Sequence, residues 1–241
     1  MPNPTAAILV IGDEILSGRT RDANAYHLAG ELGSVGIDLR EIRVVPDTHD
    51  VIVDALNALR AAYTHVFTSG GIGPTHDDIT ADAVAAAFDV GIDVRADARA
   101  LLEEALARRG SAVTTDQLRM ARIPDGAALI VNGVSGAPGF SIGNVHVLAG
   151  VPSIFVAMLD VVLPTLAAGA PVHSREVRFD VGEGRVATPL RALAEEMPQL
   201  SIGSYPFRDG DVRGTNIVVR GTDLALIDEA VARLEAIRAS L

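Results

Sequence analysis

The feature that most constrains the fold of this 241-residue chain is a glycine-rich loop between a short strand and a helix. The apolar run His65–Thr68 passes directly into TSGGIGPT, and the helical segment Asp78–Phe88 follows. A β-rich run, a tight loop and a helix in this order are typical of α/β proteins. The three glycines of the loop can adopt backbone angles that other residues resist, and they leave room for a ligand. We therefore expect an α/β fold with a ligand-binding loop after one of its strands.

Strand-like and helical segments alternate up to about residue 168, which predicts a mostly parallel sheet with helices on both faces. The predicted strands are Ala6–Ile11, Ile37–Val45, His65–Thr68, Ala128–Val131 and Val145–Leu148. The predicted helices are Asp22–Gly36, Asp50–Ala62, Asp78–Phe88, Ala96–Arg122 with a break near Gly110, and Pro152–Ala168.

The order of elements changes after the connection AAGAPVHS near residue 170. The following segments are the strand Arg175–Val181, the helix Arg185–Glu196, the strands Leu200–Tyr205 and Val212–Val219, and the helix Asp223–Ala239. A βαββα series of this size predicts a small α+β domain of ferredoxin-like type. We therefore expect two domains, residues 1–170 and residues 171–241.

Composition limits the partners of the chain. The formal net charge of −11 repels a polyphosphate backbone, so nucleic-acid binding is not expected. The absence of cysteine excludes disulfides, thiolate metal sites and iron–sulfur clusters. The apolar run near the N-terminus, AAILVI, is too short for a signal peptide or a membrane span. We expect a cytoplasmic protein without membrane association.

The glycine loop has the properties of an anion-binding cradle. Backbone N–H groups in such a loop and at a helix start point outward without partners and attract a phosphate. Hydroxyl groups of Ser69 and Thr75 can add donors. The loop lacks the lysine of a Walker loop, and its spacing does not match the dinucleotide fingerprint. The predicted ligand-binding residues of the loop are Ser69, Gly70, Gly71, Gly73, Pro74 and Thr75.

Two adjacent carboxylates, Asp77 and Asp78, follow the loop. Beside a phosphate they are unfavourable unless a cation lies between them, and carboxylate oxygens suit Mg²⁺ or Mn²⁺. The alternative is a tight turn in which Asp77 or Asp78 only caps the next helix. His76 is either a ligand or acid–base group, or a polar surface residue.

Three further loops follow predicted strands, at the sheet edge where open α/β proteins bind ligands. They contribute the candidate residues Gly12, Asp13, Glu14, Asn24, Asp47 and Gly150. Asp47 either ligates a metal or caps the next helix, and the acids of the first loop either belong to the site or are solvated. In the C-terminal part, GSYPF carries Tyr205 and Phe207, which either stack on a planar ligand or pack in a core. Tyr205 is the candidate ligand-binding residue of this stretch.

Six motifs in order resemble those of the molybdopterin-binding-like domain: IGDEILSG, VVPD, TSGGIGPTHDDIT, MARIPDGA, APGF and AGVP. This domain occurs in competence/damage-inducible protein A and at the N-terminus of eukaryotic FAD synthases. The tail, with HSREV and IGSYPF, resembles the small second domain of the FAD-synthase branch. The resemblance implies a MoaB/MogA-like three-layer α/β sandwich with a mostly parallel sheet, followed by the small α+β domain.

The resemblance also implies an activity, which is metal-dependent hydrolysis of the pyrophosphate in an ADP-ribose-like or FAD-like dinucleotide. The chain is then a nucleotide pyrophosphatase that uses Mg²⁺, Mn²⁺ or Co²⁺. Two alternatives stay open: a module that binds or adenylylates molybdopterin, and a non-catalytic domain that senses nucleotides. Relatives form dimers and trimers, so a homo-oligomer is expected.

In the pyrophosphatase hypothesis, the metal ion is held by Asp78 together with Asp47 or Asp13. Asp78 and Asp47 match acids that matter for activity in relatives, and Glu14 or Asp77 orients the attacking water. The chain departs from the family at the usual LPGVP motif, where Ala149 replaces the first proline.

Overall fold

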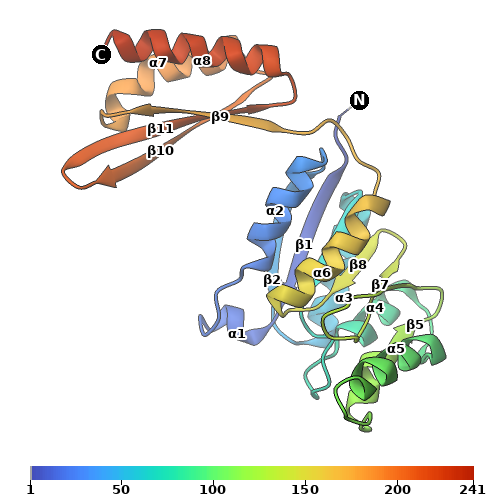
Figure 1. Cartoon of the computed structure of the whole chain (residues 1–241). Coiled ribbons are helices and arrows are strands. Elements are labelled where there is room, and N and C mark those ends of the chain that lie inside the picture. The colour runs from blue at the N-terminus through green and yellow to red at the C-terminus, as the bar shows by residue number, and fades with distance from the viewer. Residues whose placement is uncertain (1) are drawn as a thin grey trace. The chain divides into compact units, whose positions relative to one another are not determined.

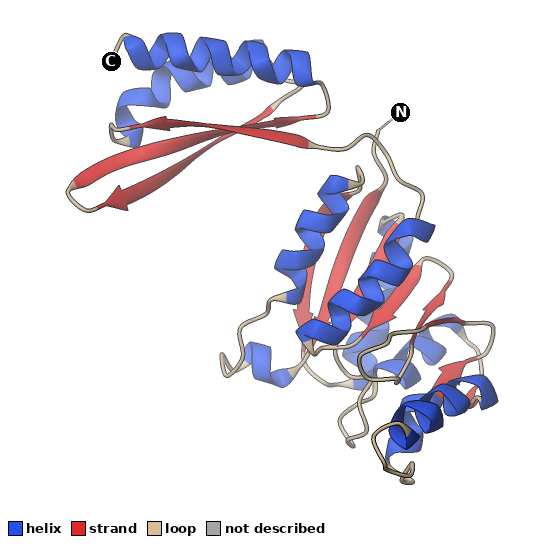
Figure 2. Ribbon diagram, in the orientation of Figure 1, coloured by secondary structure: helices blue, strands red, loops and turns tan. Residues whose placement is uncertain are grey.

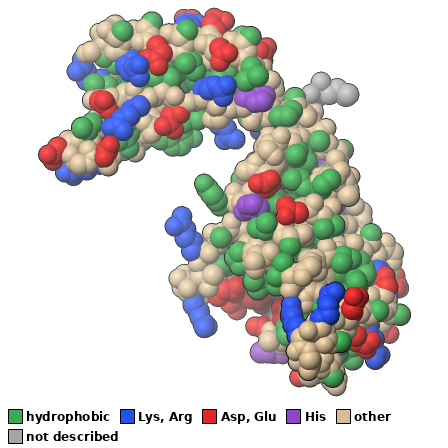
Figure 3. Space-filling view, in the orientation of Figure 1, with side chains coloured by type: hydrophobic (Ala, Val, Ile, Leu, Met, Phe, Trp, Pro, Cys, Tyr) green, Lys and Arg blue, Asp and Glu red, His purple; other side chains and the backbone are tan. Residues whose placement is uncertain are grey.

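The computed structural model describes residues 2–241. The chain divides into two compact units, one that ends at Gly169 and one that begins at Ala170. Figure 1 follows the chain through both units, Figure 2 shows their helices and strands, and Figure 3 shows the apolar and charged side chains on the surface of each unit in the same view.

The first unit is built on a six-stranded sheet. Its strands are β1 (Thr5–Ile11), β2 (Asp38–Val45), β3 (His65–Ser69), β6 (Ala128–Ile130), β7 (Gly139–Ile142) and β8 (Val145–Leu148). The order across the sheet is β2-β1-β3-β8-β7-β6, in which the first four strands are parallel and β7 and β6 are antiparallel to their neighbours. Residues Ala6–Leu9 of β1 have no exposed surface, as expected for a parallel strand that is covered on both faces.

Helices cover both faces of this sheet (Figure 1). The covering helices are α2 (Asn24–Ser34), α3 (His49–Ala62), α4 (Thr80–Phe88) and α6 (Pro152–Val162). The unit also contains the short helix α1 (Asp13–Leu16), which buries no residue, and α5 (Ala96–Ala107). Leu28 of α2 and Phe155 of α6 belong to the apolar core on one face, and Leu56 of α3 and Val84 of α4 to the core on the other. The predicted three-layer α/β sandwich with a mostly parallel sheet is confirmed.

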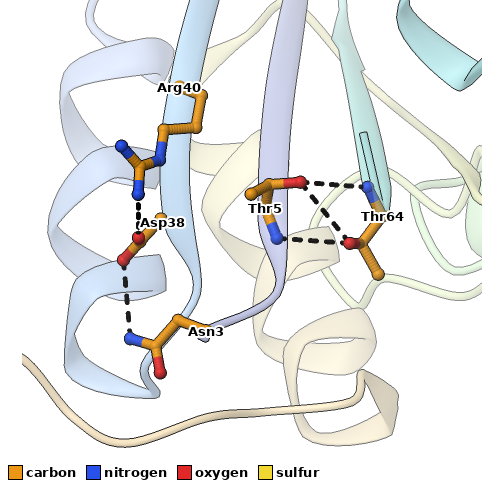
Figure 4. Close-up of polar contacts among 5 residues, drawn as sticks. All are labelled: Asn3, Thr5, Asp38, Arg40 and Thr64. Atoms are coloured by element: carbon orange, nitrogen blue, oxygen red, sulfur yellow. Dashed lines mark hydrogen bonds and ion pairs between the residues drawn. The ribbon is translucent and has the colours of Figure 1, made fainter. Parts of the chain in front are cut away.

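Polar contacts join the first strands at their N-terminal ends (Figure 4). The backbone N–H of Thr5 donates to Thr64 Oγ1 at 3.2 Å, just before β3. The Asn3 amide donates to Asp38 Oδ1 at 3.5 Å, and Arg40 Nη2 donates to Asp38 Oδ2 at 2.5 Å. These contacts lie at the N-terminal ends of the parallel strands, whereas the loops of the candidate site follow their C-terminal ends.

The predicted helix Ala96–Arg122 is wrong in its second half. The segment consists of α5, a 3₁₀ helix (Gln117–Ala121) and strand β5 (Arg122–Pro124), which pairs antiparallel with β4 (Ile92–Val94). Gly110 has a φ of +73°, a left-handed conformation that does not continue a helix. The helix predicted over Pro152–Ala168 ends at Val162, and a short 3₁₀ turn, Leu163–Thr165, follows it. Pro164 in this turn has no N–H group to extend the helix.

The second unit contains β9 (His173–Phe179), α7 (Glu183–Glu196), β10 (Ser201–Asp209), β11 (Val212–Gly221) and α8 (Leu224–Ala239). Its antiparallel sheet has the order β10-β11-β9, and both helices pack on one face of it (Figure 2). The βαββα order is therefore as predicted. Asp223 caps α8 by accepting from the N–H groups of Ala225 and Leu226. Within residues 2–241, no helix has the length and apolar character to cross a membrane.

Candidate functional site

A cleft of about 480 Å³ lies at the C-terminal edge of the parallel strands. Its walls include the loops after β1, β2, β3 and β8. The chain passes from β1 to β2 on one side and later returns to β3 on the other side of β1, so the strand order reverses between β1 and β3. Open α/β sheets bind their ligands at such a reversal. The candidate residues that line this cleft are Gly12, Glu14, Asp47, Gly70, Gly71, Gly73, Pro74, Asp77, Asp78 and Gly150.

The glycines of the loop are required by the packing of the protein itself. Gly70 has a φ of +106°, and a Cβ atom there would lie 2.3 Å from the backbone oxygen of Ile11. Gly71 has a φ of +70°, and its Cβ would lie 2.1 Å from Thr80 Oγ1. Side chains at these two positions are therefore excluded by backbone conformation and by neighbouring atoms, before any ligand is considered.

Three consecutive N–H groups of the loop are free of protein acceptors. Across residues 2–241, no carbonyl or side chain accepts from the backbone nitrogens of Gly71, Ile72 and Gly73, and these residues line the cleft. Thr75 differs, because its N–H and its hydroxyl both donate to Asp78 Oδ2, at 2.8 and 2.6 Å. The expected anion cradle therefore consists of the amides at 71–73, and the amide of Thr75 is already used.

Asp78 shapes the loop and does not cap the helix. Helix α4 begins at Thr80, and no side chain of the described residues 2–241 caps it, so the alternative in which Asp77 or Asp78 caps α4 is wrong. The Asp78 carboxylate closes the turn through Thr75, and its backbone oxygen accepts from Arg119 Nη2 at 3.3 Å. The Thr75 side chain also lowers the pKa of Asp77, as the largest contribution to that shift.

The buried hydroxyl of Thr80 connects the loop to α4. Thr80 has no exposed surface, and its Oγ1 donates to the backbone oxygen of Gly70 at 3.0 Å. Its backbone N–H donates to the oxygen of Gly71 at 2.9 Å. The start of α4 and the two glycines are therefore held as one piece.

Asp47 joins the loop after β2 to the loop after β1. Its Oδ2 accepts from the backbone N–H of Asp13 at 2.9 Å. Burial raises the pKa of Asp47, the Asp13 N–H opposes this shift, and the negative charges of Asp13, Glu14 and Asp77 raise it further. Asp47 is therefore a partly desolvated carboxylate surrounded by other acids, a position that a cation would stabilise.

Glu14 lies over the loop after β1. A Cβ atom on Gly12 would lie 2.6 Å from Glu14 Oε2, so the carboxylate occupies the space above this glycine. Glu14 lines the cleft and also an adjoining cavity of about 70 Å³. Asp13 is exposed and is not among the residues that line the cleft, so its contribution is the backbone N–H that binds Asp47.

Asn24 connects two of the site loops from α2. It is buried, and its Nδ2 donates to Ser69 Oγ and to the backbone oxygen of Gly150, both at 2.8 Å. Ser69 is the last residue of β3, and Gly150 lies in the loop after β8. The Asn24 amide therefore connects the ends of two neighbouring strands. Asn24 and Ser69 line the smaller cavity rather than the main cleft.

The donor set fits a divalent ion in chemistry, since Glu14, Asp47, Asp77 and Asp78 all line one cleft. Among residues 2–241 no three His, Cys, Asp or Glu side chains lie close enough together to form a metal cluster by themselves. The acids of this cleft would therefore share an ion with oxygens of the ligand, as phosphate-bound Mg²⁺ commonly is.

Sequence reasoning missed several residues of the cleft. Met120, Ser135, Ala137, Ile154 and Met158 add a largely apolar wall. Their side chains carry no signal of chemistry, although Met120 begins the MARIPDGA motif and Ala137 begins the APGF motif.

The loop after β6 is shaped by a buried asparagine, Asn132. Asn132 Oδ1 accepts from the N–H groups of Val134 and Ser135, at 3.1 and 2.8 Å. Its Nδ2 donates to the backbone oxygen of Ala137 at 2.7 Å. Tyr205, in contrast, belongs to the second unit, is 56% exposed on β10, and is not among the residues that line the cleft.

Comparison with known proteins assigns the first unit. Residues 7–168 match the family described as probable molybdopterin binding domain. The chain belongs to this family. A protein of Pyrobaculum calidifontis is 37% identical over 213 residues, which cover 84% of this chain and 81% of that protein. A CinA-like protein of Gemmatimonas aurantiaca is 33% identical over 223 residues, 87% of this chain but only 52% of that protein. The chain thus spans about half the length of this CinA-like relative.

A solved structure supports the assignment to the molybdopterin-binding-domain family. The crystal structure of CinA from Thermoplasma acidophilum, a protein described as of unknown function, matches with a TM-score of 0.63 and 32% identity. The match covers 68% of this chain and 99% of that one. Residues 171–239 match the middle domain of FAD synthase. The resemblance inferred from the motifs is therefore confirmed.

Proposed function

We propose that the cleft binds a nucleotide with a pyrophosphate bridge, of ADP-ribose-like or FAD-like type, and hydrolyses that bridge with a divalent metal ion. The observation that carries this proposal is the combination, in one cleft, of four carboxylates and three backbone N–H groups that have no acceptor among residues 2–241. Free amides bind a phosphate, whereas carboxylates beside a phosphate need a cation.

The N–H groups of Gly71, Ile72 and Gly73 would hold one phosphate of the bridge. The loop is preorganised for this role, because Thr80 binds both Gly70 and Gly71 through hydrogen bonds. Fixed donors cost no reorganisation when charge develops on the phosphate oxygens during the reaction.

Asp78 and Asp47 would hold the metal ion from two sides of the cleft, with the remaining ligands supplied by phosphate oxygens. Bound there, Mg²⁺, Mn²⁺ or Co²⁺ would supply positive charge that polarises a phosphoryl oxygen. Asp13 keeps Asp47 in place through its backbone N–H. Glu14 or Asp77, which also line the cleft, would accept a hydrogen bond from the attacking water and orient it.

The apolar part of the cleft fits the base of such a nucleotide. Ile72, Met120, Ile154 and Met158 line the same cavity as the acids. Methionine side chains make favourable contacts with aromatic rings and adapt to their outline. Addition of one water across the bridge gives AMP and ribose 5-phosphate from ADP-ribose, or AMP and FMN from FAD.

A second candidate function is the binding of molybdopterin. It is favoured by the match of residues 7–168 to the probable molybdopterin-binding domain family. A pterin ring with a phosphate would use the same apolar wall and the same free amides, so the fold and the cradle agree with both candidates.

The deciding experiment measures AMP release from ADP-ribose and from FAD with Mg²⁺, Mn²⁺ or Co²⁺ supplied in turn. We expect turnover with at least one of these ions and a loss of about 10²-fold or more in Asp78→Asn, by analogy with the removal of one electrostatic stabiliser. Asparagine keeps an oxygen that can accept from Thr75, so the loop is retained. The matched control is Asp160→Asn, an exposed position on α6, which we expect to leave turnover unchanged.

If Asp78→Asn hydrolysed the substrate at the wild-type rate with full metal dependence, Asp78 would have no role in the reaction. Absence of AMP with every ion, together with tight binding of molybdopterin in a titration, would replace hydrolysis by the second candidate function.

A further inference from the structure

The aromatic stretch GSYPF, which the cleft does not use, lies on β10 of the second unit. Helices α7 and α8 pack on one face of the sheet, where Ile217 and Val219 of β11 are buried with them. Side chains alternate along a strand, so Asn216 and Val218 lie on the other face, which we call the open face. Tyr205 pairs with Asn216 across the strands and shares the open face.

Two aromatic rings on the open face lie against glycine positions. A Cβ atom on Gly203 would lie 3.1 Å from Cε2 of Tyr205, and one on Gly214 would lie 2.3 Å from Cζ of Phe207. Because neither glycine has a side chain, the rings rest along the backbone. Tyr205 is 56% exposed, so it presents ring surface to the solvent.

Arg178 of β9 adds a second planar group to the open face. Its guanidinium lies 4.2 Å from the centroid of the Phe207 ring and pairs with Asp180 at 2.8 Å and Asp209 at 3.4 Å. In the strand register, Asn216 of β11 lies opposite Tyr205 of β10 on one side and opposite Arg178 of β9 on the other. Tyr205, Asn216 and Arg178 therefore form a row across three strands, which spans about 10 Å at the usual strand spacing.

The row is long enough for a ring system of three fused rings, and an arginine beside it favours one that carries a phosphate group. Asn216 Oδ1 in the middle of the row is covered by neighbouring atoms and has no hydrogen-bond partner among residues 2–241. Arg220 lies on the same face of β11, four residues further along, and is exposed. Within the described part of the chain Arg220 forms no ion pair with an acid.

We propose that the open face binds flavin mononucleotide (FMN). The isoalloxazine ring stacks on Tyr205 and on the guanidinium of Arg178, and the phosphate binds Arg220. Aromatic and guanidinium planes stack on heterocycles, and Arg220 complements the phosphate charge. Residues 171–239 match the middle domain of FAD synthase, which agrees with a flavin. The nearby acids Asp180 and Asp209 disfavour a polyanion such as RNA. This site is separate from the cleft and does not require the proposed hydrolysis.

The test is a titration of FMN with the full-length protein, followed by quenching of flavin fluorescence. We expect Tyr205→Ala to weaken FMN binding roughly 5- to 150-fold, the range of one stacked ring. Tyr205→Phe keeps the ring and should retain binding. The matched control is Tyr26→Ala, because Tyr26 on α2 is 87% exposed but belongs to the first unit.

The phosphate contact is tested separately with riboflavin, which has the same ring but no phosphate. Arg220→Gln should weaken FMN binding and leave riboflavin binding unchanged. Asp78→Asn should retain FMN binding even if hydrolysis is lost, which separates this site from the cleft. Equal FMN affinity of wild type and Tyr205→Ala, or no FMN binding at all, would overturn the proposal. Burial of Tyr205 in a self-associated dimer, seen by sedimentation with and without Tyr205→Ala, would overturn it as well.

Discussion

Acid should destabilise the first unit through one buried histidine. His146 on β8 is 6% exposed. The centroid of its ring lies 5.2 Å from that of Phe67 and 5.8 Å from that of His65. Its Nδ1 forms a 2.9 Å hydrogen bond with Ser141 Oγ. Its Nε2 is buried without a partner among residues 2–241. Burial, assisted by the nearby His65, lowers the pKa of His146 to about 4.

The sign and size of the effect follow from proton binding. In the unfolded chain this histidine titrates near pH 6.5, whereas in the folded protein its side chain stays neutral until about pH 4. Between these values the unfolded state binds the additional proton, so stability falls as the pH falls. The resulting loss of unfolding free energy begins near pH 6.5 and reaches about 2 kcal/mol at pH 5 and about 3 kcal/mol at pH 4.

The assay is urea unfolding at several pH values between 7.5 and 4.5 for wild type and His146→Gln. Glutamine can still bond to Ser141 but cannot titrate, so the difference in unfolding free energy between the two proteins should narrow as the pH falls. His76→Gln is the control, because this side chain is 98% exposed. The reasoning is refuted if the wild type and His146→Gln lose stability in parallel over the whole pH range.

Three further predictions concern the loop and the division of the chain. Gly71→Ala should destabilise the protein by about 1–2 kcal/mol because of the left-handed backbone alone, and by more because the new Cβ would contact Thr80 Oγ1. The control in thermal unfolding is Gly110→Ala, where φ is also left-handed at +73° but no atom of the described residues lies within 4 Å of the Cβ position. Thr80→Val should cost about 1–3 kcal/mol in urea unfolding, because it leaves the Gly70 oxygen without its donor, and an unchanged midpoint would contradict the role of this hydroxyl. A chain cut after Gly169 should unfold cooperatively as a soluble unit, because the cores of the two units share no residue; an insoluble fragment, or one that melts without cooperativity, would show that both units fold together.

The structure changes the expectation for the glycine loop in one respect. From the sequence, Gly71 is expected to leave room for a ligand. The contact of its Cβ position with Thr80 Oγ1 at 2.1 Å shows that protein packing already excludes a side chain. A ligand-binding defect in a Gly71 variant therefore has to be compared with its loss of stability.

The sequence alone determined the class of fold and the set of chemical groups. Continuous apolar runs such as Ala6–Ile11 and the strand–glycine–helix order of the loop report local preferences, which each segment carries by itself. The acids Asp47 and Asp78 were recognised because they directly follow strands or a glycine loop. The motifs also identified the family before any geometry was known.

Only the tertiary structure decided how these groups act together. Asn24 binds Ser69 and Gly150, which lie 45 and 126 positions away in the chain, and Arg119 reaches back 41 positions to Asp78. Asp78 closes a turn instead of capping a helix because Thr80, held by Gly70 and Gly71, sets the start of α4. Such contacts depend on which strand ends the sheet brings side by side, and local sequence periodicity carries no information on that.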